Sequence, residues 1–317
     1  MEIKDLRFET RQIHAGLNKH EKTGSRGVAI YPTAAYRFSS CDQAARLFEL
    51  TEPGNIYTRL QNPTTTSYEE RITALYGATG ALALSSGMSA ILIAITALAS
   101  QGENIVASPL LYGGTYNQFR HTLRRLGIEV RIAKGESPED FAELVDSRTR
   151  AIFCESMGNP TCGVADIERI AQVSRQNEIP LIVDNTFGAG GYLCNPFDWG
   201  ADIVIESATK WINGHGTAMG GIIVDGGNFN WGNGKFPGID GPSEGYHGLN
   251  FHKAFGQGAF IVKCRVDGLR DLGSCPSAFD SYLMLLGLET LSLRVRHQVE
   301  ATRTLAEHLR GHKAVKK

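Results

Sequence analysis

A lysine and an aspartate in the middle of the chain have types and surroundings that suit one kind of chemistry. Lys210 ends the cluster Ser207-Ala208-Thr209-Lys210, which follows an apolar run, and Asp184 ends another apolar run. A lysine amine can form a Schiff base with an aldehyde, hydroxyls can hold a phosphate, and a carboxylate can keep a pyridine nitrogen protonated. These are the needs of pyridoxal phosphate, so the sequence predicts a site for that cofactor with Lys210 as the Schiff-base lysine.

The spacing within this cluster suggests how it would work. Ser207 and Thr209 are two residues apart, so in an extended segment both hydroxyls would face one way and Lys210 the other. Phosphate would then lie on one side of the segment and the aldehyde carbon on the other. Asp184 ends a predicted strand, at the edge where parallel α/β sheets bind ligands, although an isolated aspartate more often caps a turn.

Three loops near predicted strand ends hold further candidates. Gly87 and Met88 open a predicted helix, where free backbone N–H groups could bind an anion, although a plain tight turn is an equal alternative. Tyr112 precedes two glycines and could stack on a flat cofactor or pack in the core. Asn159 follows a predicted strand and precedes Pro160, so it could reach the ligand or only form a turn.

Other residue types give weaker signals. Tyr57 and Arg59 could donate hydrogen bonds to a phosphate, but their spacing alone favours two surface residues. The histidines show no metal-ligand spacing, and the glycines over 214–220 lack the strand context of a dinucleotide fingerprint. We therefore predict neither a metal ion nor a dinucleotide.

Composition sets the broad class. The 317 residues are 42% hydrophobic and 21% charged, as in ordinary globular proteins, and the net charge of −1 offers no general attraction for nucleic acid or membrane. The six cysteines form no CxxC pair, which favours reduced thiols over a disulfide framework. The N-terminus lacks the apolar stretch of a secretory signal, and the apolar segment 90–99 is too short to span a bilayer. These features predict a cytoplasmic protein.

Short apolar runs alternate with helical patterns from residue 74 onward, after an irregular N-terminal segment. Continuous apolar strands separated by helices predict an α/β fold with a mostly parallel sheet covered on both faces. We expect 226–258 to be a long ordered loop and 282–309 to be one amphipathic helix. The predicted strands are 81–84, 104–107, 128–133, 150–155, 180–184, 203–206 and 221–224. The other predicted helices are 88–100, 115–126, 138–145 and 167–175.

Four motifs together resemble those of a known family. They are Tyr57-Thr58-Arg59-Leu60-Gln61-Asn62-Pro63-Thr64, Ser85-Ser86-Gly87-Met88-Ser89-Ala90, Val183-Asp184-Asn185-Thr186-Phe187 and Ser207-Ala208-Thr209-Lys210. The chain resembles the Cys/Met-metabolism family of pyridoxal phosphate enzymes from about Thr10 to its last residue. This resemblance implies an aspartate-aminotransferase-like fold, fold type I. Within the family, the aromatic stretch after Val224 and the segment 286–291 resemble the O-acetylhomoserine sulfhydrylases.

The resemblance implies a role for each candidate residue. Lys210 would be the Schiff-base lysine and Asp184 the pyridinium partner, while Tyr112 would stack on the ring and Asn159 would lie near its hydroxyl. Phosphate would be held by Gly87, Met88, Ser207 and Thr209. Tyr57 and Arg59 would reach the phosphate of a neighbouring subunit, which implies a homo-oligomer, expected as a dimer of dimers.

The resemblance also implies a division of the chain into three parts. An N-terminal arm over 1–62 would wrap a neighbouring subunit, a large pyridoxal phosphate-binding domain would span 63–265, and 266–317 would begin a C-terminal domain. In the family that last domain carries an arginine clamp for the substrate α-carboxylate. We therefore expect low activity from these 317 residues alone. Part of the apolar stripe Leu285, Leu288, Leu291 and Val295 is expected to face such a domain.

The implied reaction is γ-replacement, in which O-acetyl-L-homoserine and sulfide give L-homocysteine and acetate, a step of methionine and cysteine biosynthesis. Lys210 would move protons on the substrate carbons. Another family reaction, that of a cystathionine γ-synthase or a methionine γ-lyase, would use the same cofactor residues. Two alternatives remain: an aminotransferase of the same fold, and a chain that binds the cofactor with little turnover.

Overall fold

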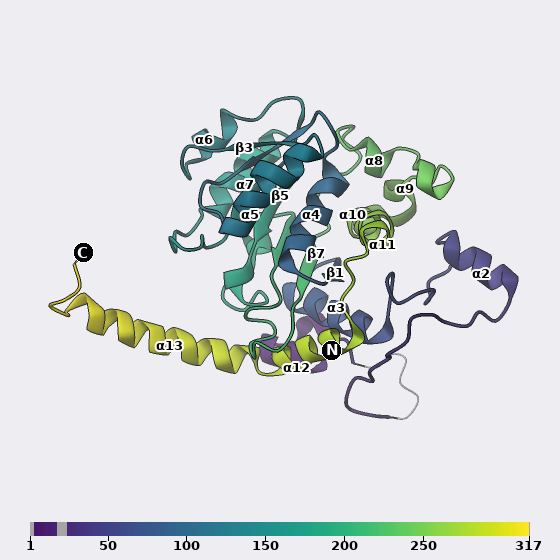
Figure 1. The fold of residues 1–317 in the computed structure, drawn as a ribbon, viewed down its shortest axis with the longest axis horizontal. Helices are drawn as coiled ribbons and strands as arrows, with labels where there is room; N and C mark the ends of the chain where they lie inside the picture. Colours follow the sequence, from purple (N-terminus) through teal and green to yellow (C-terminus); the bar gives the residue numbers. More distant parts are fainter. Residues whose placement is uncertain (1–2, 18–23, 317) are drawn as a thin grey trace.

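One seven-stranded sheet organises the computed structural model, which describes residues 3–17 and 24–316 (Figure 1). The strand order is β1-β7-β6-β5-β4-β2-β3. Only β7 runs antiparallel to its neighbours, β1 and β6, so the predicted mostly parallel α/β sheet is confirmed. The strands are β1 (Gly80–Leu84), β2 (Asn104–Ala107), β3 (Glu129–Ile132), β4 (Thr149–Glu155), β5 (Leu181–Asp184), β6 (Ile203–Glu206) and β7 (Gly221–Asp225).

Both faces of the sheet are buried, because apolar residues run continuously through its central strands. In β4, Phe153 packs with the cluster that includes α4 (Gly87–Leu98), while its neighbour Ile152 packs on the opposite face with α7 (Ile167–Gln176). A third hydrophobic cluster packs α3 (Pro63–Tyr76) against β1, β6 and β7. The predicted buried helix after Ser86 is therefore confirmed as α4.

The remaining helices are mostly short. They are α1 (Phe8–His14), α2 (Cys41–Phe48), α5 (Gly113–Asn117), α6 (Pro138–Ala142), α8 (Pro237–Asp240), α9 (Phe251–Phe255), α10 (Ala259–Lys263), α11 (Arg270–Leu272), α12 (Ala278–Glu289) and α13 (Leu291–Arg310). A π-helical turn, Gln118–Leu123, extends α5. No helix among the described residues is both long and apolar enough to cross a membrane.

Two segments differ from the sequence expectation of irregular structure. The N-terminal segment contains α1 and α2, and α1 packs on its own chain, where Gln12 Nε2 donates a hydrogen bond to Ser292 Oγ at 3.0 Å. The stretch expected as a loop over 226–258 contains α8 and α9, and its aromatic rings pack on one another and on α10, as Tyr246 does on Phe251 and Trp231 on Phe260. Short helices of this kind depend on tertiary packing, which the local pattern does not reveal.

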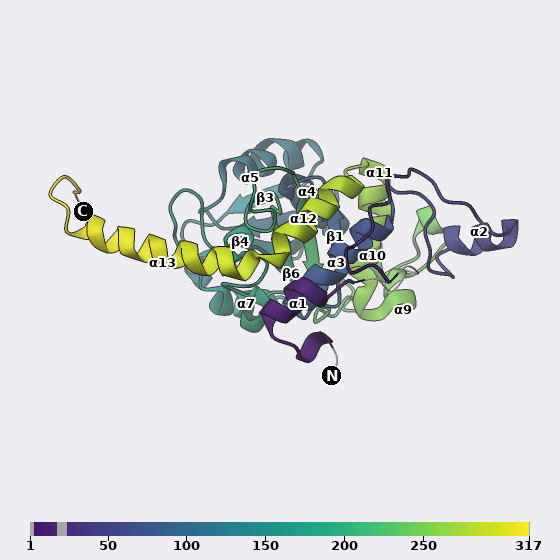
Figure 2. The ribbon, with the colours of Figure 1, turned by 90° about the horizontal axis from the view of Figure 1, so that it is seen from below.

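The helix expected over 282–309 is two helices, because Thr290 leaves the helical conformation between α12 and α13. The apolar stripe of Leu285, Leu288, Leu291 and Val295 is at most 2% exposed and packs against α3. The expectation that part of it faces another domain is therefore wrong. The apolar residues that α13 exposes are others, including Leu293 and Leu305. Beyond Val295 the helix projects away from the sheet (Figures 1 and 2).

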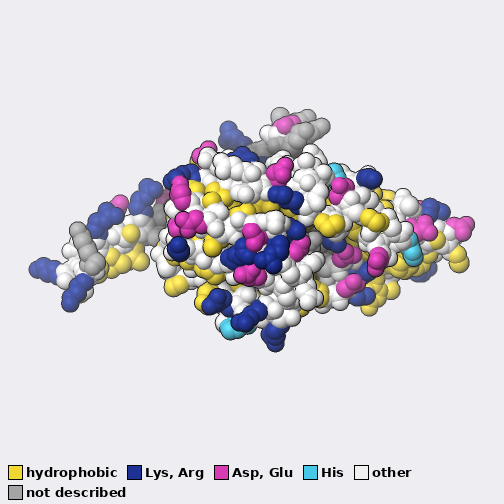
Figure 3. Space-filling view, turned by 90° about the horizontal axis from the view of Figure 1, so that it is seen from above, with side chains coloured by type: hydrophobic (Ala, Val, Ile, Leu, Met, Phe, Trp, Pro, Cys, Tyr) yellow, Lys and Arg dark blue, Asp and Glu magenta, His cyan; other side chains and the backbone are white. Residues whose placement is uncertain are grey.

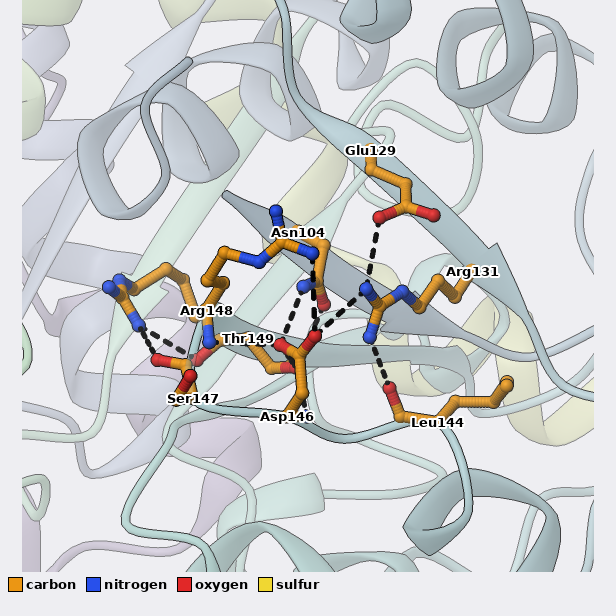
Figure 4. Close-up of polar contacts among 9 residues, drawn as sticks. Asn104, Glu129, Arg131, Leu144, Asp146, Ser147, Arg148 and Thr149 are labelled. Carbon is orange, nitrogen blue, oxygen red and sulfur yellow. Dashed lines mark hydrogen bonds and ion pairs between the residues drawn. The ribbon is translucent and has the colours of Figure 1, made fainter. Parts of the chain in front are cut away.

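A polar network holds the ends of β2, β3 and β4 that lie opposite the strands' carboxyl ends (Figure 4). Asp146 accepts hydrogen bonds from Asn104 Nδ2 and from the backbone N–H of Arg148, both at 2.9 Å, and pairs with Arg131 Nη2 at 2.9 Å. The bond from Asn104 leads the causes that lower the pKa of Asp146. On the face seen in Figure 3, basic and acidic side chains are likewise mixed with one another. This network aligns the strands without approaching the opposite edge of the sheet.

Candidate active site

A cavity of about 590 Å³ lies at the carboxyl ends of β4, β5 and β6. This is the edge at which open parallel sheets bind ligands. Eight of the ten residues predicted from the sequence line it: Gly87, Met88, Tyr112, Asn159, Asp184, Ser207, Thr209 and Lys210.

The first turn of α4 forms one wall of this cavity. Ser86 caps the helix, since its hydroxyl accepts a hydrogen bond from Ser89 N at 3.2 Å. A Cβ at Gly87 would lie 2.9 Å from Ser207 Cβ, so only glycine lets the helix start approach the Ser207 turn this closely. The backbone N–H groups of a helix's first turn have no intrahelical partners and favour an anion. The wall therefore suits a phosphate.

The segment from Ser207 to Lys210 is a turn and not an extended strand, so the predicted alternation of its side chains is wrong. The turn forms because Lys210 N donates to Ser207 O at 3.1 Å, and Gly214 N donates to Lys210 O at 2.8 Å. Thr209 Oγ1 donates to Gly220 O and accepts from Gly220 N, which joins the turn to the start of β7. As a result, Ser207, Thr209 and Lys210 all line the same cavity.

Lys210 carries a free amine at the cavity. Among the described residues, its Nζ has no hydrogen-bond or ion-pair partner. An unpaired lysine amine at a cavity is suited to covalent chemistry with a carbonyl ligand.

Asp184 is held in place by Thr186. Its Oδ1 accepts hydrogen bonds from Thr186 Oγ1 at 2.6 Å and from Thr186 N at 3.0 Å. The same hydroxyl oxygen accepts a hydrogen bond from Ser207 N at 2.9 Å, which connects the carboxyl to the turn of Lys210. Burial raises the pKa of Asp184, and the two bonds from Thr186 oppose that rise. A cation beside this carboxyl would favour its ionised form.

Two further residues of the cavity were missed by sequence reasoning. Glu155 ends β4 as Asp184 ends β5, so the strand-end carboxylate was a signal that could have identified it. Arg294 comes from α13, and its Nη2 donates to Trp211 O at 3.1 Å and to Gly287 O at 2.7 Å. It has no local sequence signal, because it reaches the cavity only through the packing of α13.

Tyr57 and Arg59 are not among the residues that line the cavity. Both are exposed, and the Arg59 guanidinium lies 5.6 Å from the centre of the Tyr57 ring. Arg59 Nη1 donates a hydrogen bond to Arg270 O. Within one chain these two residues therefore lie apart from the eight others.

The residues of the cavity fit pyridoxal phosphate. The unpaired amine of Lys210 suits an aldehyde, the start of α4 with Ser207 suits a phosphate, and Asp184 suits a protonated ring nitrogen. Tyr112 is 50% exposed at the cavity, so one face of its ring is free to stack on a flat ligand.

Comparison with known proteins gives a consistent picture. Residues 9–317 match the family model described as Cys/Met metabolism PLP-dependent enzyme. The chain is 53% identical to O-acetyl-L-homoserine sulfhydrylase 1 of Thermus thermophilus, over 96% of this chain and 72% of that protein. It is 49% identical to homocysteine synthase of Schizosaccharomyces pombe, over 99% of this chain and 74% of that protein.

A solved structure extends the comparison to three dimensions. It is that of a Campylobacter jejuni protein described as an O-acetylhomoserine (thiol)-lyase, solved with N'-pyridoxyl-lysine-5'-monophosphate. The TM-score is 0.95 at 35% identity, over 98% of this chain and 77% of that one. The family match, the sequence relatives and the fold agree with the geometry of the cavity, and the chain belongs to the family of Cys/Met metabolism pyridoxal phosphate-dependent enzymes.

Proposed function

We propose that this enzyme catalyses γ-replacement, converting O-acetyl-L-homoserine and sulfide into L-homocysteine and acetate. The observation that carries the proposal is the free amine of Lys210, in one cavity with Asp184 and the anion-binding start of α4. The 53% identity to the Thermus thermophilus O-acetyl-L-homoserine sulfhydrylase supports this choice among the reactions of the family.

The residues would share the work as follows. When bound, pyridoxal phosphate supplies an electron sink for bonds broken at the substrate carbons. Gly87 and Met88 would hold its phosphate through backbone N–H groups, and Asp184 would keep its ring nitrogen protonated. Tyr112 would stack on the ring, and Asn159 would lie beside the ring hydroxyl. Ser207 and Thr209 would complete the phosphate site.

Lys210 would carry the protons. Its long, flexible stem lets one amine reach neighbouring carbons of the substrate, so Nζ can remove the proton from Cα. Loss of a second proton from Cβ allows acetate to leave Cγ with its bonding electrons. Sulfide then forms the new C–S bond at Cγ, and the two protons return to Cβ and Cα.

The choice of nucleophile tests the proposal. The purified chain, reconstituted with pyridoxal phosphate, would be given O-acetyl-L-homoserine with either sulfide or cysteine, and Lys210→Ala would serve as the inactive control. Homocysteine formed from sulfide, at a rate well above cystathionine formed from cysteine, is the expected result. Cystathionine as the main product would instead assign the chain to cystathionine synthesis.

We also propose that the enzyme is a homo-oligomer, a dimer of dimers, in which Tyr57 and Arg59 reach the phosphate site of a neighbouring subunit. Their exposed position, away from the cavity of their own chain, supports this role. Mixing Arg59→Ala chains with Lys210→Ala chains should restore some sites. In a mixed oligomer, a site can take Lys210 from the first chain and Arg59 from the second. Full cofactor affinity in a monomer would contradict the proposal. The cytoplasmic location and the three-part division of the chain remain predictions.

A further inference from the structure

Glu155 connects two loops of the active site. Its Oε1 accepts a hydrogen bond from the backbone N–H of Tyr112 at 2.6 Å. The backbone N–H of Asn159 also lies near this carboxyl and acts to lower its pKa. Glu155 is only 7% exposed, whereas both Tyr112 and Asn159 are exposed, so a buried carboxyl binds the backbone of one exposed residue and lies near that of the other.

The two loops also touch each other directly. A Cβ at Gly158 would lie 3.0 Å from both Cβ and the carbonyl oxygen of Leu110, and a Cβ at Gly163 would lie 2.8 Å from Leu110 Cδ1. Glycine at these positions lets the loop of Asn159 lie against the loop of Tyr112. Because the contact is this close, a shift of either loop would move the other.

Glu155 stands beside Asp184 in the sheet, where the two residues are register partners on β4 and β5. Burial, followed by the charge of Asp184, raises the pKa of Glu155 to about 8, and Glu136 adds to the rise. At neutral pH the carboxyl is therefore largely protonated. It accepts the bond from Tyr112 N without adding a second full negative charge beside Asp184.

We propose that Glu155 is a positioning residue, whose carboxyl sets the spacing of the Tyr112 and Asn159 loops and thereby the fit of the site to the cofactor ring. Glu155 acts through the backbone amide of Tyr112 and the close contact between the two loops, and does not itself contact the reacting atoms. The inference rests on the roles proposed above for Tyr112 and Asn159. It does not depend on which substrate the enzyme uses, so its test reads cofactor binding and backbone protection, not sulfhydrylase activity.

The test compares Glu155→Ala with Asp225→Ala as a matched control. Asp225 is also a buried carboxyl that accepts a backbone hydrogen bond, from Gly227 N at 2.9 Å, but it lies at the opposite edge of the sheet, level with the first residue of β6. Both variants should melt at a lower temperature than the unmodified chain. Only Glu155→Ala should weaken pyridoxal phosphate binding, by about 3- to 10-fold in Kd, since the hydrogen bond that holds the Tyr112 backbone is lost.

Hydrogen exchange in the cofactor-free protein gives a second readout. The amides of Tyr112 and Asn159 should exchange about tenfold faster or more in Glu155→Ala and stay protected in Asp225→Ala. If Glu155→Ala fails to fold, Glu155→Gln decides the matter. Its amide keeps an acceptor oxygen for Tyr112 N but places an NH2 group where the other carboxyl oxygen lies, so an intermediate loss of affinity is expected. Unchanged Kd and unchanged exchange at both amides in the folded Glu155 variant would overturn the proposal.

Discussion

The hydroxyl of Tyr76 donates a hydrogen bond to the carboxyl of Glu206, although the two residues are 130 positions apart in the chain. Asn185 Nδ2 donates to the same Tyr76 oxygen at 2.9 Å, and Gly190 N donates to Glu206 at 3.0 Å. The network is buried and joins the end of α3 to β6 and to the residue that follows Asp184. It therefore stabilises the sheet edge from the side opposite α4.

Removing the hydroxyl of Tyr76 should destabilise the protein. Tyr76→Phe keeps the ring and its edge contact with Phe197 but removes one buried hydrogen-bond partner each from Glu206 and Asn185. We expect a loss of about 1–3 kcal/mol in the free energy of unfolding, measured by urea denaturation of the cofactor-free chain. The control is Tyr68→Phe, because the buried Tyr68 hydroxyl has no hydrogen-bond partner among the described residues. Equal losses in the two variants would mean that the network adds no stability.

Stability should fall as the pH rises from about 5 to about 9. Burial raises the pKa of Glu206 from 4.5 in the unfolded chain to about 8 in the fold, so the folded state holds a proton that the unfolded state has lost. This contribution is complete below the unfolded pKa and disappears as the pH passes the folded pKa. Urea midpoints at about pH 6 and about pH 9, on either side of the folded pKa, measure this contribution of Glu206 to stability.

The variant Glu206→Gln separates this carboxyl from the others. Glu155 and Asp225, with pKa values raised to about 8 and about 7, act in the same direction, so the variant should retain a smaller dependence on pH. A pH dependence as steep as that of the unmodified chain would show that Glu206 is not responsible.

Asp184→Asn should spare much of the cofactor binding but lower turnover. The phosphate contacts remain, while the charged partner of the ring nitrogen is lost. A hydrogen bond to a charged group contributes about 1.5–3 kcal/mol, which corresponds to a decrease of about 10- to 100-fold in kcat. Cofactor absorbance and homocysteine formation measure the two effects separately. Near-normal kcat in this variant would show that Asp184 is not the ring partner.

The loop after Lys210 offers a test of how Arg294 supports the site. Gly214 and Gly216 both have positive φ, at 70° and 67°, so alanine is strained at either position. A Cβ at Gly214 would also lie 2.1 Å from Arg294 Nη1, whereas nothing lies within 4 Å of a Cβ at Gly216. The hydrogen bonds from Arg294 to Trp211 O and Gly287 O would be lost if the guanidinium moved aside, so Gly214→Ala should cost about 1–3 kcal/mol more than Gly216→Ala in thermal or urea unfolding. Equal costs would show that Arg294 moves aside freely.

Borohydride reduction should attach the cofactor to Lys210. Its amine is the one that lies unpaired at the cavity, so peptide mapping of the reduced holoenzyme should find the pyridoxyl group on that residue. Lys210→Ala should yield no labelled peptide. A label on another lysine would contradict the assignment.

Much of this protein can be predicted from local sequence. The strands are short apolar runs bounded by polar residues, and this pattern placed Asp184 and the cluster before Lys210 at strand ends, where parallel sheets bind ligands. The start of α4 was predictable for the same reason, because Ser86 and Gly87 mark a cap and a close approach. The four motifs also predicted the Cys/Met-metabolism family, and the match to that family's model confirms this prediction.

The tertiary structure decided what depends on contacts between distant segments. Glu155 reaches the Tyr112 loop because β4 lies beside β2, and no periodicity along the chain predicts that these two strands are neighbours. The same holds for Arg294, which the packing of α13 brings to the cavity. The sequence by itself therefore determined the strands of the sheet, the helices between them and the chemical groups. Only the fold determined which groups meet, because strand order and helix packing follow from burying all the apolar surfaces at once.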